Sequence, residues 1–310
     1  MRVLRPVVGA VPCAEAADLL GAPRSATRLY RARDGDLVTL RVPTPTGTTE
    51  VRMRRRNGDD QVARGVGEGG LWGFEPPLPA LFVELARRSH GAVVDVGANT
   101  GLYSLLAVAA NPTVRVHAVE ASPAVAAFLG ENLAINRLLA RRVEVHRCAV
   151  SDQTGTATLY LPPPSGSTVE TSASLDPTFK EEVASTVDVA AVTLDDLWES
   201  TGGSPVGLVK VDTEGTEHLV LRGAARLLER SRPVTVCEVL PRAATGELAT
   251  WLSGAGYLDV RLRPDSLVVS PAVAFDPDAW NHAFVPTERL ESFQSSARAI
   301  GLELRDAHDG

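Results

Sequence analysis

A glycine-containing turn between a predicted strand and a predicted helix is the first place in the sequence where chemistry is expected. Residues 93–96 are apolar except at one position and predict a buried strand, and leucines recur at helical spacing over residues 102–110. In an open α/β sheet, such a turn lets the backbone approach a ligand closely. The turn contains Gly97, Asn99, Thr100 and Gly101, and Asp95 lies near the end of the strand before it.

The spacing of these glycines argues against a dinucleotide. Position 99 is Asn, so the turn lacks the second glycine of the G-x-G-x-x-G pattern that brings the backbone to a pyrophosphate. Glu120 ends the next predicted strand, where a ribose would lie across the crevice. An ionised carboxylate can accept hydrogen bonds from both ribose hydroxyls. The competing interpretation of Glu120 is a solvent-exposed acid at a strand end.

A second group of ionisable residues follows the strand predicted at 208–212. Its candidate catalytic residues are Lys210, Asp212, Glu214 and His218. One hypothesis makes a carboxylate of this group the general base for a hydroxyl proton, and another places Mg²⁺ on Asp212, Glu214 and Glu238. A structural lysine–carboxylate network that caps the next helix is compatible with both. His218 is either a further base or a histidine on a helix surface.

The elements that must position these residues alternate regularly between strand and helix. Predicted strands cover 93–96, 114–120, 143–150, 208–212, 233–239, 258–262, 266–269 and 283–286, and predicted helices cover 78–88, 102–110, 123–133, 219–230, 247–254 and 288–301. Residues 37–43 and 48–53 predict a separate β-hairpin. Residues 157–161 and 187–192 predict a second pair of strands, whose long Pro-, Ser- and Thr-rich connection favours a functional loop over the site.

Composition narrows the class of protein. The 310 residues carry a net charge of −7, which argues against a nucleic-acid partner, and the arginines at 52–56 fit a solvated hairpin edge better than a phosphate patch. Cys13, Cys148 and Cys237 show no metal or disulfide spacing. The sequence has neither a signal-peptide profile at its start nor an apolar run of membrane-spanning length, so we expect a cytoplasmic protein.

The chain resembles the class I S-adenosylmethionine-dependent methyltransferases in its glycine turn and in the acid after the second strand. Further motifs are similar to the FkbM family in order and spacing, and the segment around Lys210 is the most specific of them. The likeness covers roughly residues 72–286. The motifs that carry it are Val94–Gly101, Ala149–Asp152, Thr193–Leu197, Val209–Glu217 and Cys237–Val239.

The resemblance implies a Rossmann-like α/β fold, with a seven-stranded, mostly parallel sheet and helices on both faces. We expect this domain at residues 71–310, after a small β-rich extension at 1–70. It also implies S-adenosylmethionine as cofactor, with its ribose on Glu120. The cofactor-binding residues at its methionine end would be Asp95, Gly97, Asn99, Thr100 and Gly101. Ala121 and Ser122 would lie beside the adenine.

Three more residues complete the candidate cofactor site. Ser151 and Asp152 would meet the adenine edge, although Asp152 is equally compatible with a plain turn residue. Glu75, which lies just before the helix predicted at 78–88, is also a candidate cofactor-binding residue. Its neighbours Trp72 and Phe74 either pack between the two parts of the chain or form a wall of the crevice.

The function that these implications favour is O-methylation of a hydroxyl on a sugar or secondary metabolite. Methylation of nitrogen or of a carboxyl group is the alternative within the same class. Two other classes of protein fit the sequence less well. An NAD-dependent oxidoreductase would need the dinucleotide-binding glycine spacing, which this chain lacks. A non-catalytic protein with a vestigial cofactor site would have no need to keep Glu120 or the ionisable group around Lys210. A small-molecule acceptor is the expected partner, and an oligomer is compatible with the sequence.

Overall fold

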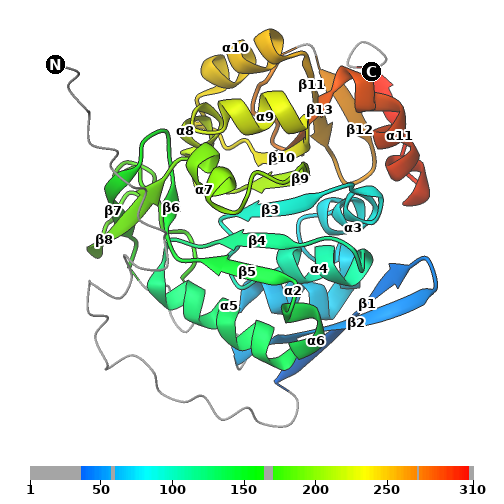
Figure 1. The fold of residues 1–310 in the computed structure, drawn as a ribbon, viewed down its shortest axis with the longest axis horizontal. Coiled ribbons are helices and arrows are strands. Elements are labelled where there is room, and N and C mark those ends of the chain that lie inside the picture. Colours follow the sequence, from blue (N-terminus) through cyan, green and yellow to red (C-terminus); the bar gives the residue numbers. More distant parts are fainter. Residues whose placement is uncertain (1–35, 57–59, 164–169, 271, 307–310) are drawn as a thin grey trace, which may run out of the picture.

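The computed structural model describes residues 36–56, 60–163, 170–270 and 272–306. Predictions that fall on residues 1–35, including Cys13, and on residues 164–169 of the long loop lie outside the described residues. Most of the described chain builds one large sheet with helices on both faces (Figure 1). The predicted α/β fold is therefore confirmed.

The large sheet has nine strands in the order β14-β12-β11-β13-β10-β9-β3-β4-β5, so it contains two strands beyond the predicted seven. Neighbouring strands from β5 to β10 are parallel, whereas β13 runs antiparallel to both β10 and β11. The strands are β3 (Ala92–Val96), β4 (Val116–Val119), β5 (Val143–His146), β9 (Val206–Val211), β10 (Val234–Glu238), β11 (Tyr257–Leu262), β12 (Leu267–Ser270), β13 (Asn281–Pro286) and β14 (Leu304–Asp306).

The order of strands determines where a ligand can bind. From β3 the chain proceeds to β4 on one side, and it later returns to place β9 on the other side. Ligands of open α/β sheets bind outside the carboxyl ends of the strands at such a reversal. The fold therefore places the expected crevice after β3, β4 and β9.

Two hydrophobic cores cover the two faces of the sheet. Because side chains alternate along a strand, Val93 of β3 packs with one core while Val94 and Val96 pack with the other. The first core includes α3 (Leu78–Arg88), α4 (Leu102–Ala110), α5 (Pro123–Ile135) and α11 (Leu290–Ala299). The second includes α7 (Leu194–Ser200), α8 (Glu217–Arg222), α9 (Ala225–Ser231) and α10 (Thr245–Ala255).

A three-stranded sheet projects beside the large one, at the left in Figure 1. It consists of β6 (Ala149–Val150), β8 (Ser185–Val192) and β7 (Gly155–Leu161). The antiparallel pairing of β7 with β8 confirms the predicted pair of strands. Residues 143–150 were expected as one strand, but the chain leaves β4 after His146 and pairs with β8 from Ala149 onward.

The N-terminal hairpin packs on the main body. Strands β1 (Leu37–Thr44) and β2 (Gly47–Arg54) pair as predicted, and their buried side chains belong to the same core as α3 and α4. A helix that the sequence analysis missed, α2 (Gln61–Gly69), follows the hairpin, and the side chain of Asp60 caps it by accepting a hydrogen bond from the backbone N–H of Ala63. The domain boundary near residue 70 stays a prediction.

The helix predicted at 219–230 is two helices. Between α8 and α9 the chain passes Gly223, where an added Cβ would lie 2.2 Å from the backbone oxygen of Ser151. The Asp195 carboxylate of α7 accepts hydrogen bonds from the backbone N–H groups of Arg226 and Leu227, at 3.0 and 2.8 Å. A residue distant in sequence therefore caps α9, which local periodicity does not reveal. The short segments η2 (Gly70–Trp72), α6 (Arg137–Ala140) and η3 (Thr287–Arg289) complete the helices.

Among the described residues, no helix combines the length and the apolar character needed to cross a membrane.

Candidate active site

A cavity of about 860 Å³ opens at the carboxyl ends of β3, β4, β9 and β10. It brings together most of the predicted site residues, although they come from five separate segments of the chain. The predicted residues in its lining are Glu75, Gly97, Asn99, Thr100, Glu120, Ala121, Lys210, Asp212, Glu214 and Glu238.

The glycine turn has little room for a side chain at its first position. Gly97 has a φ of +75°, and an added Cβ would lie 1.7 Å from the backbone oxygen of Asp212. Asn99 also has a positive φ, 52°, and its side-chain oxygen accepts a hydrogen bond from the backbone N–H of Thr100 at 2.7 Å. This left-handed backbone is uncommon outside glycine, and Asn tolerates it better than most residues. The turn therefore lies tightly against the end of β9.

Glu120 is tied to the glycine turn by its own carboxylate. One carboxylate oxygen accepts a hydrogen bond from the backbone N–H of Asn99 at 2.9 Å, and the other accepts one from Ser122 at 2.8 Å. Burial raises the pKa of Glu120 to about 7, although both hydrogen bonds oppose the rise. Because an ionised carboxylate has about four acceptor positions, further donors can bind the same two oxygens.

Lys210 lies at the base of the cavity and is only 2% exposed. Its Nζ donates to Oδ2 of Asp212 at 2.6 Å and lies 4.6 Å from the ring centre of Tyr103. Burial alone would lower the pKa of Lys210, but the negative charges of Asp212, Glu75 and Asp95 raise it above its usual value. The ammonium therefore stays charged and neutralises part of the surrounding negative charge.

Tyr103 connects this pair to the helix entry. Its hydroxyl donates to a carboxylate oxygen of Glu75 at 3.0 Å. Glu75 has a positive φ of 42°, and its pKa is raised by burial and by the negative charge of Asp212. Glu75 and Tyr103 thus belong to the same polar network as Lys210.

Two further carboxylates line the cavity near Asp212. Burial, followed by the charge of Asp212, raises the pKa of Glu214 to about 8, and the same two causes raise the pKa of Glu238 well above its usual range. Among the described residues, Asp212, Glu214 and Glu238 do not form a group whose ligand atoms all lie within 4.8 Å of one another, and the Mg²⁺ site stays a prediction.

Glu217 has a structural position in the loop after β9. One of its carboxylate oxygens accepts from the backbone N–H groups of Thr213 and Gly215, at 2.9 and 3.1 Å, and from the Thr213 hydroxyl at 3.2 Å. The side chain is 1% exposed and is absent from the cavity lining. It therefore fixes the loop that carries Asp212 and Glu214.

The predicted functional loop does lie at the cavity. Its described part contributes residues 170–173, Leu175, Phe179 and Lys180 to the lining. The Ser174 hydroxyl donates to the backbone oxygen of Glu214 at 2.8 Å, which ties this loop to the loop after β9. Phe74 also lines the cavity, whereas Trp72 is 43% exposed and does not.

Several predicted site residues lie outside the lining. Asp95 is fully buried beneath the turn and accepts a hydrogen bond from the Ser104 hydroxyl at 2.6 Å. The Ser122 side chain caps α5, and Asp152 forms an ion pair with Arg222 at 2.9 Å. His218 lines a separate cavity beside α10. The predicted residues outside the lining are Asp95, Gly101, Ser122, Ser151, Asp152 and His218.

Other lining residues were missed from the sequence. Tyr103 had a usable indication, because an aromatic residue in the first turn after the glycine loop faces the crevice. Gln61 and Val62 had none, since α2 was not predicted. Arg242 follows β10 and Trp280 directly precedes β13, and the sequence did not show that these two strands are neighbours in the sheet.

Comparison of the sequence with models of known protein families identifies the family of this chain. Residues 95–258 match the model of the methyltransferase FkbM domain, which is more than half of the chain. The chain belongs to the FkbM methyltransferase family.

Curated members and a solved structure resemble this FkbM-family protein to different extents. It is 30% identical to 31-O-demethyl-FK506 methyltransferase FkbM of Streptomyces tacrolimicus over 55% of this chain and 74% of that protein. It is 31% identical to methyltransferase sdnD of Sordaria araneosa over 44% of this chain and 61% of that protein. The crystal structure of methyltransferase FkbM from Methylobacillus flagellatus KT is 17% identical, with a TM-score of 0.44 over 63% of this chain and 44% of that one.

The matched segment of this FkbM-family protein contains the glycine turn, Glu120 and the carboxylates after β9 and β10. Glu75 and Trp280, which also line the cavity, lie outside the matched segment.

Proposed function

We propose that this protein transfers a methyl group from S-adenosylmethionine to a hydroxyl of a small-molecule acceptor. The observation that carries the proposal is one cavity whose lining contains both the Glu120-anchored glycine turn and the Lys210–Asp212–Glu214 group. The proposed cofactor site and the proposed proton acceptor would thus share one cavity.

The residues present fit S-adenosylmethionine. Each oxygen of Glu120 already accepts one backbone N–H and keeps acceptor capacity for a ribose hydroxyl. Five other carboxyl groups, Glu75, Glu170, Asp212, Glu214 and Glu238, line the cavity together with Lys180, Lys210 and Arg242. The ionised forms of these carboxyl groups would attract a ligand that carries a cationic sulfonium and an ammonium group.

When bound, the cofactor supplies an electrophilic methyl group on sulfur. The task of the chain is to hold the acceptor oxygen in line with that methyl and to accept the proton of the hydroxyl. Positioning of two reactants supplies a large part of the acceleration in such a displacement. A cavity lined in part by residues 170–173 and by Lys180 supports this role.

We propose Glu214 as the general base and the Lys210–Asp212 pair as the groups that fix its surroundings. With a pKa of about 8, Glu214 has a basicity suited to removing a proton near neutral pH. Asp212 has one oxygen engaged by Lys210 at 2.6 Å, so it is the less available acceptor. No metal is needed for this assignment, and turnover should therefore survive a chelator.

The acceptor class rests on the relatives and on the lining. The Streptomyces relative is named for methylation of an oxygen of a natural product, and the polar lining residues of the cavity include Thr171, Ser172, Lys180 and Arg242. We propose a hydroxylated sugar or secondary metabolite. Methylation of nitrogen or of a carboxyl group remains the second candidate within the same reaction.

The test is detection of product by mass spectrometry with S-adenosylmethionine labelled by deuterium in its methyl group. A panel of hydroxylated, amino and carboxylated metabolites is offered to the purified chain. The proposal expects the labelled methyl on oxygen, and labelling about 10²- to 10⁴-fold slower with Glu214→Gln. Label on nitrogen or carboxyl would overturn the acceptor assignment. Binding of the cofactor without transfer to any compound of the panel, including acceptors of the relatives, would favour a vestigial site.

A further inference from the structure

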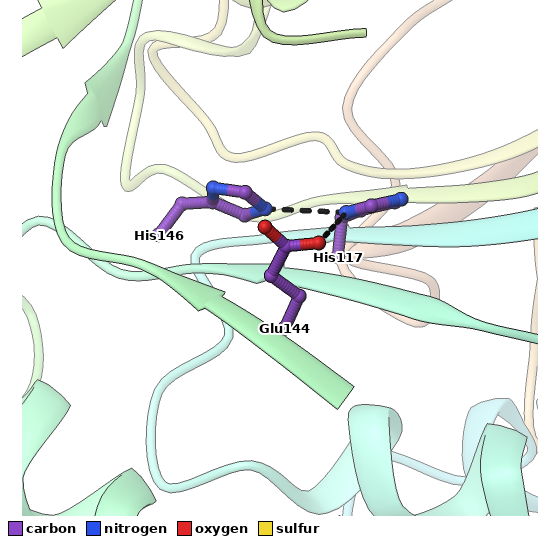
Figure 2. A group of neighbouring side chains, drawn as sticks. All are labelled: His117, Glu144 and His146. Atoms are coloured by element: carbon purple, nitrogen blue, oxygen red, sulfur yellow. Dashed lines mark hydrogen bonds and ion pairs between the residues drawn. The ribbon is translucent and has the colours of Figure 1, made fainter. Parts of the chain in front are cut away.

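Two histidines and a glutamate meet on one face of the sheet near its β5 edge (Figure 2). His117 comes from β4, and Glu144 and His146 come from β5. In the parallel register of these strands, His117 lies opposite Glu144, and Glu144 and His146 are two positions apart and so point to the same face. The sheet itself therefore brings three metal-ligating side chains together.

The spacing of their ligand atoms suits a small divalent ion. Nδ1 of His117 lies 3.2 Å from Nε2 of His146 and 3.5 Å from Oε2 of Glu144, and all three ligand atoms lie within 4.8 Å of one another. Two ligands bound to Zn²⁺ at its usual distances and tetrahedral angle are about 3.3 Å apart. Figure 2 shows the three side chains converging on one point from three directions.

The surroundings leave the group accessible and its histidines able to act as ligands. The side chain of Glu144 is 63% exposed, whereas that of His117 is 15% exposed. Burial lowers the pKa of both His117 and His146, although Glu144 opposes this, and Arg115 adds to the lowering at His117. A neutral imidazole is the form that binds a metal.

We propose that His117, Glu144 and His146 bind a divalent transition-metal ion of the Zn²⁺ type, with water in the remaining coordination position. Two imidazoles and one carboxylate are a common ligand set for Zn²⁺. This ion would fasten edge strand β5 to β4 just before the end that carries Glu120, whose backbone N–H donates to the oxygen of His146 at 3.0 Å. The proposal is independent of the proposed methyl transfer, because the three residues lie outside the lining of the cofactor cavity.

The competing explanation is a direct hydrogen bond between the two neutral imidazoles, with no ion. It needs one ring nitrogen to donate and the other to accept, and it gives Glu144 no essential part. Metal binding needs all three residues. The two explanations therefore differ in what loss of Glu144 does.

The experiment is calorimetric titration of the untagged, chelator-treated chain with ZnCl₂, together with thermal unfolding in the presence and absence of zinc. We expect one ion per chain with a Kd below about 10 µM, and a rise in Tm when zinc is added. Glu144→Gln keeps shape and exposure but removes the anionic ligand, and should weaken binding at least about tenfold, as should His117→Ala.

The matched control is His90→Ala, which removes an exposed histidine elsewhere and should change neither affinity nor the Tm response. No saturable binding by the wild-type chain would overturn the proposal. Binding that persists with unchanged affinity in both Glu144→Gln and His117→Ala would also overturn it, because the ion would then lie elsewhere. If His117→Ala fails to fold, Glu144→Gln still decides, because its side chain is mostly exposed.

Discussion

Glu120 serves two purposes with the same two oxygens. Its hydrogen bonds to the backbone of Asn99 and Ser122 fix the glycine turn relative to the end of β4, and the remaining acceptor positions are available to a ligand. An aspartate would be one methylene shorter and could not span both loops in the same way. The residue that holds the turn in shape is therefore also the residue proposed to hold the ribose.

Replacement of Glu214 tests the proposed division between cofactor binding and catalysis. Glu214→Gln keeps the size of the side chain but removes the proton acceptor, so kcat should fall by about 10²- to 10⁴-fold. Affinity for S-adenosylmethionine should change little, because Glu120, which is proposed to hold the ribose, is unchanged in this variant. Steady-state kinetics with calorimetric binding checks both expectations.

Asp212→Asn is the companion variant. It should retain cofactor binding and lower kcat, because Lys210 loses the carboxylate that engages it at 2.6 Å. If Asp212→Asn lowered kcat strongly while Glu214→Gln remained active, Asp212 rather than Glu214 would be the base.

At the scale of elements, the close approach of β3 and β9 depends on a missing side chain. Gly97→Ala would place a Cβ 1.7 Å from the backbone oxygen of Asp212, at a φ of +75°. We expect the free energy of unfolding to fall by about 3 kcal/mol or more, since neither backbone can move freely. Denaturant unfolding measures this.

Gly130→Ala provides the control for that measurement. No atom lies within 4 Å of an added Cβ at this position in α5. Alanine should raise helix stability there by up to about 1 kcal/mol. Equal effects of the two substitutions would show that the contact between Gly97 and Asp212 is not tight.

Helix α5 connects the hairpin to the glycine turn through one buried side chain. The Asn132 oxygen accepts from the backbone N–H of Arg54 at 3.0 Å, and its amide donates to the backbone oxygen of Thr100 at 2.8 Å. Asn132→Ala leaves both groups without that partner and should lower the free energy of unfolding by about 2–4 kcal/mol.

Chemical denaturation followed by circular dichroism checks this, with Leu138→Ala as the control. Leu138 is 76% exposed, and its replacement should change stability by no more than about 0.5 kcal/mol. A loss for Asn132→Ala as small as that control would contradict the link between hairpin and turn.

At the scale of the whole molecule, the buried carboxyls make stability depend on pH. The pKa of Glu120 is raised from 4.5 to about 7 and that of Glu214 from 4.5 to about 8, first of all by burial. Between pH 4.5 and the raised pKa of each group, the folded chain binds more protons than the unfolded chain. The free energy of unfolding therefore falls as pH rises through this range.

We therefore expect ligand-free protein to lose a few kcal/mol of stability, on the order of 3 for each group, between about pH 4.5 and 8. Chemical unfolding across this range measures the loss, and Glu214→Gln should show a smaller one. A free energy of unfolding that rises with pH over the same range would contradict the burial of these groups in the folded chain.

An element of the fold or a residue of the site could be predicted from the sequence where local patterns determine it, and could not where contacts between distant segments do. The strands β3, β4, β9 and β10 and the glycine turn were predictable because their patterns are local. The break at Gly223, helix α2 and the lining residue Trp280 depend on contacts between distant segments, such as Asp195 with the start of α9. For the same reason Asp152 and His218 were expected in the site although their contacts lie beside it.

The central claim is that S-adenosylmethionine binds in the cavity against Glu120, and calorimetric titration with the cofactor tests it most directly. Wild-type chain should bind one molecule, and Glu214→Gln should bind it with similar affinity. Glu120→Ala, with its fold checked by circular dichroism, should weaken binding by about 100-fold or more, because two hydrogen bonds to a charged group are worth about 1.5–3 kcal/mol each. Wild-type affinity in folded Glu120→Ala, or no binding by the wild-type chain, would contradict the claim.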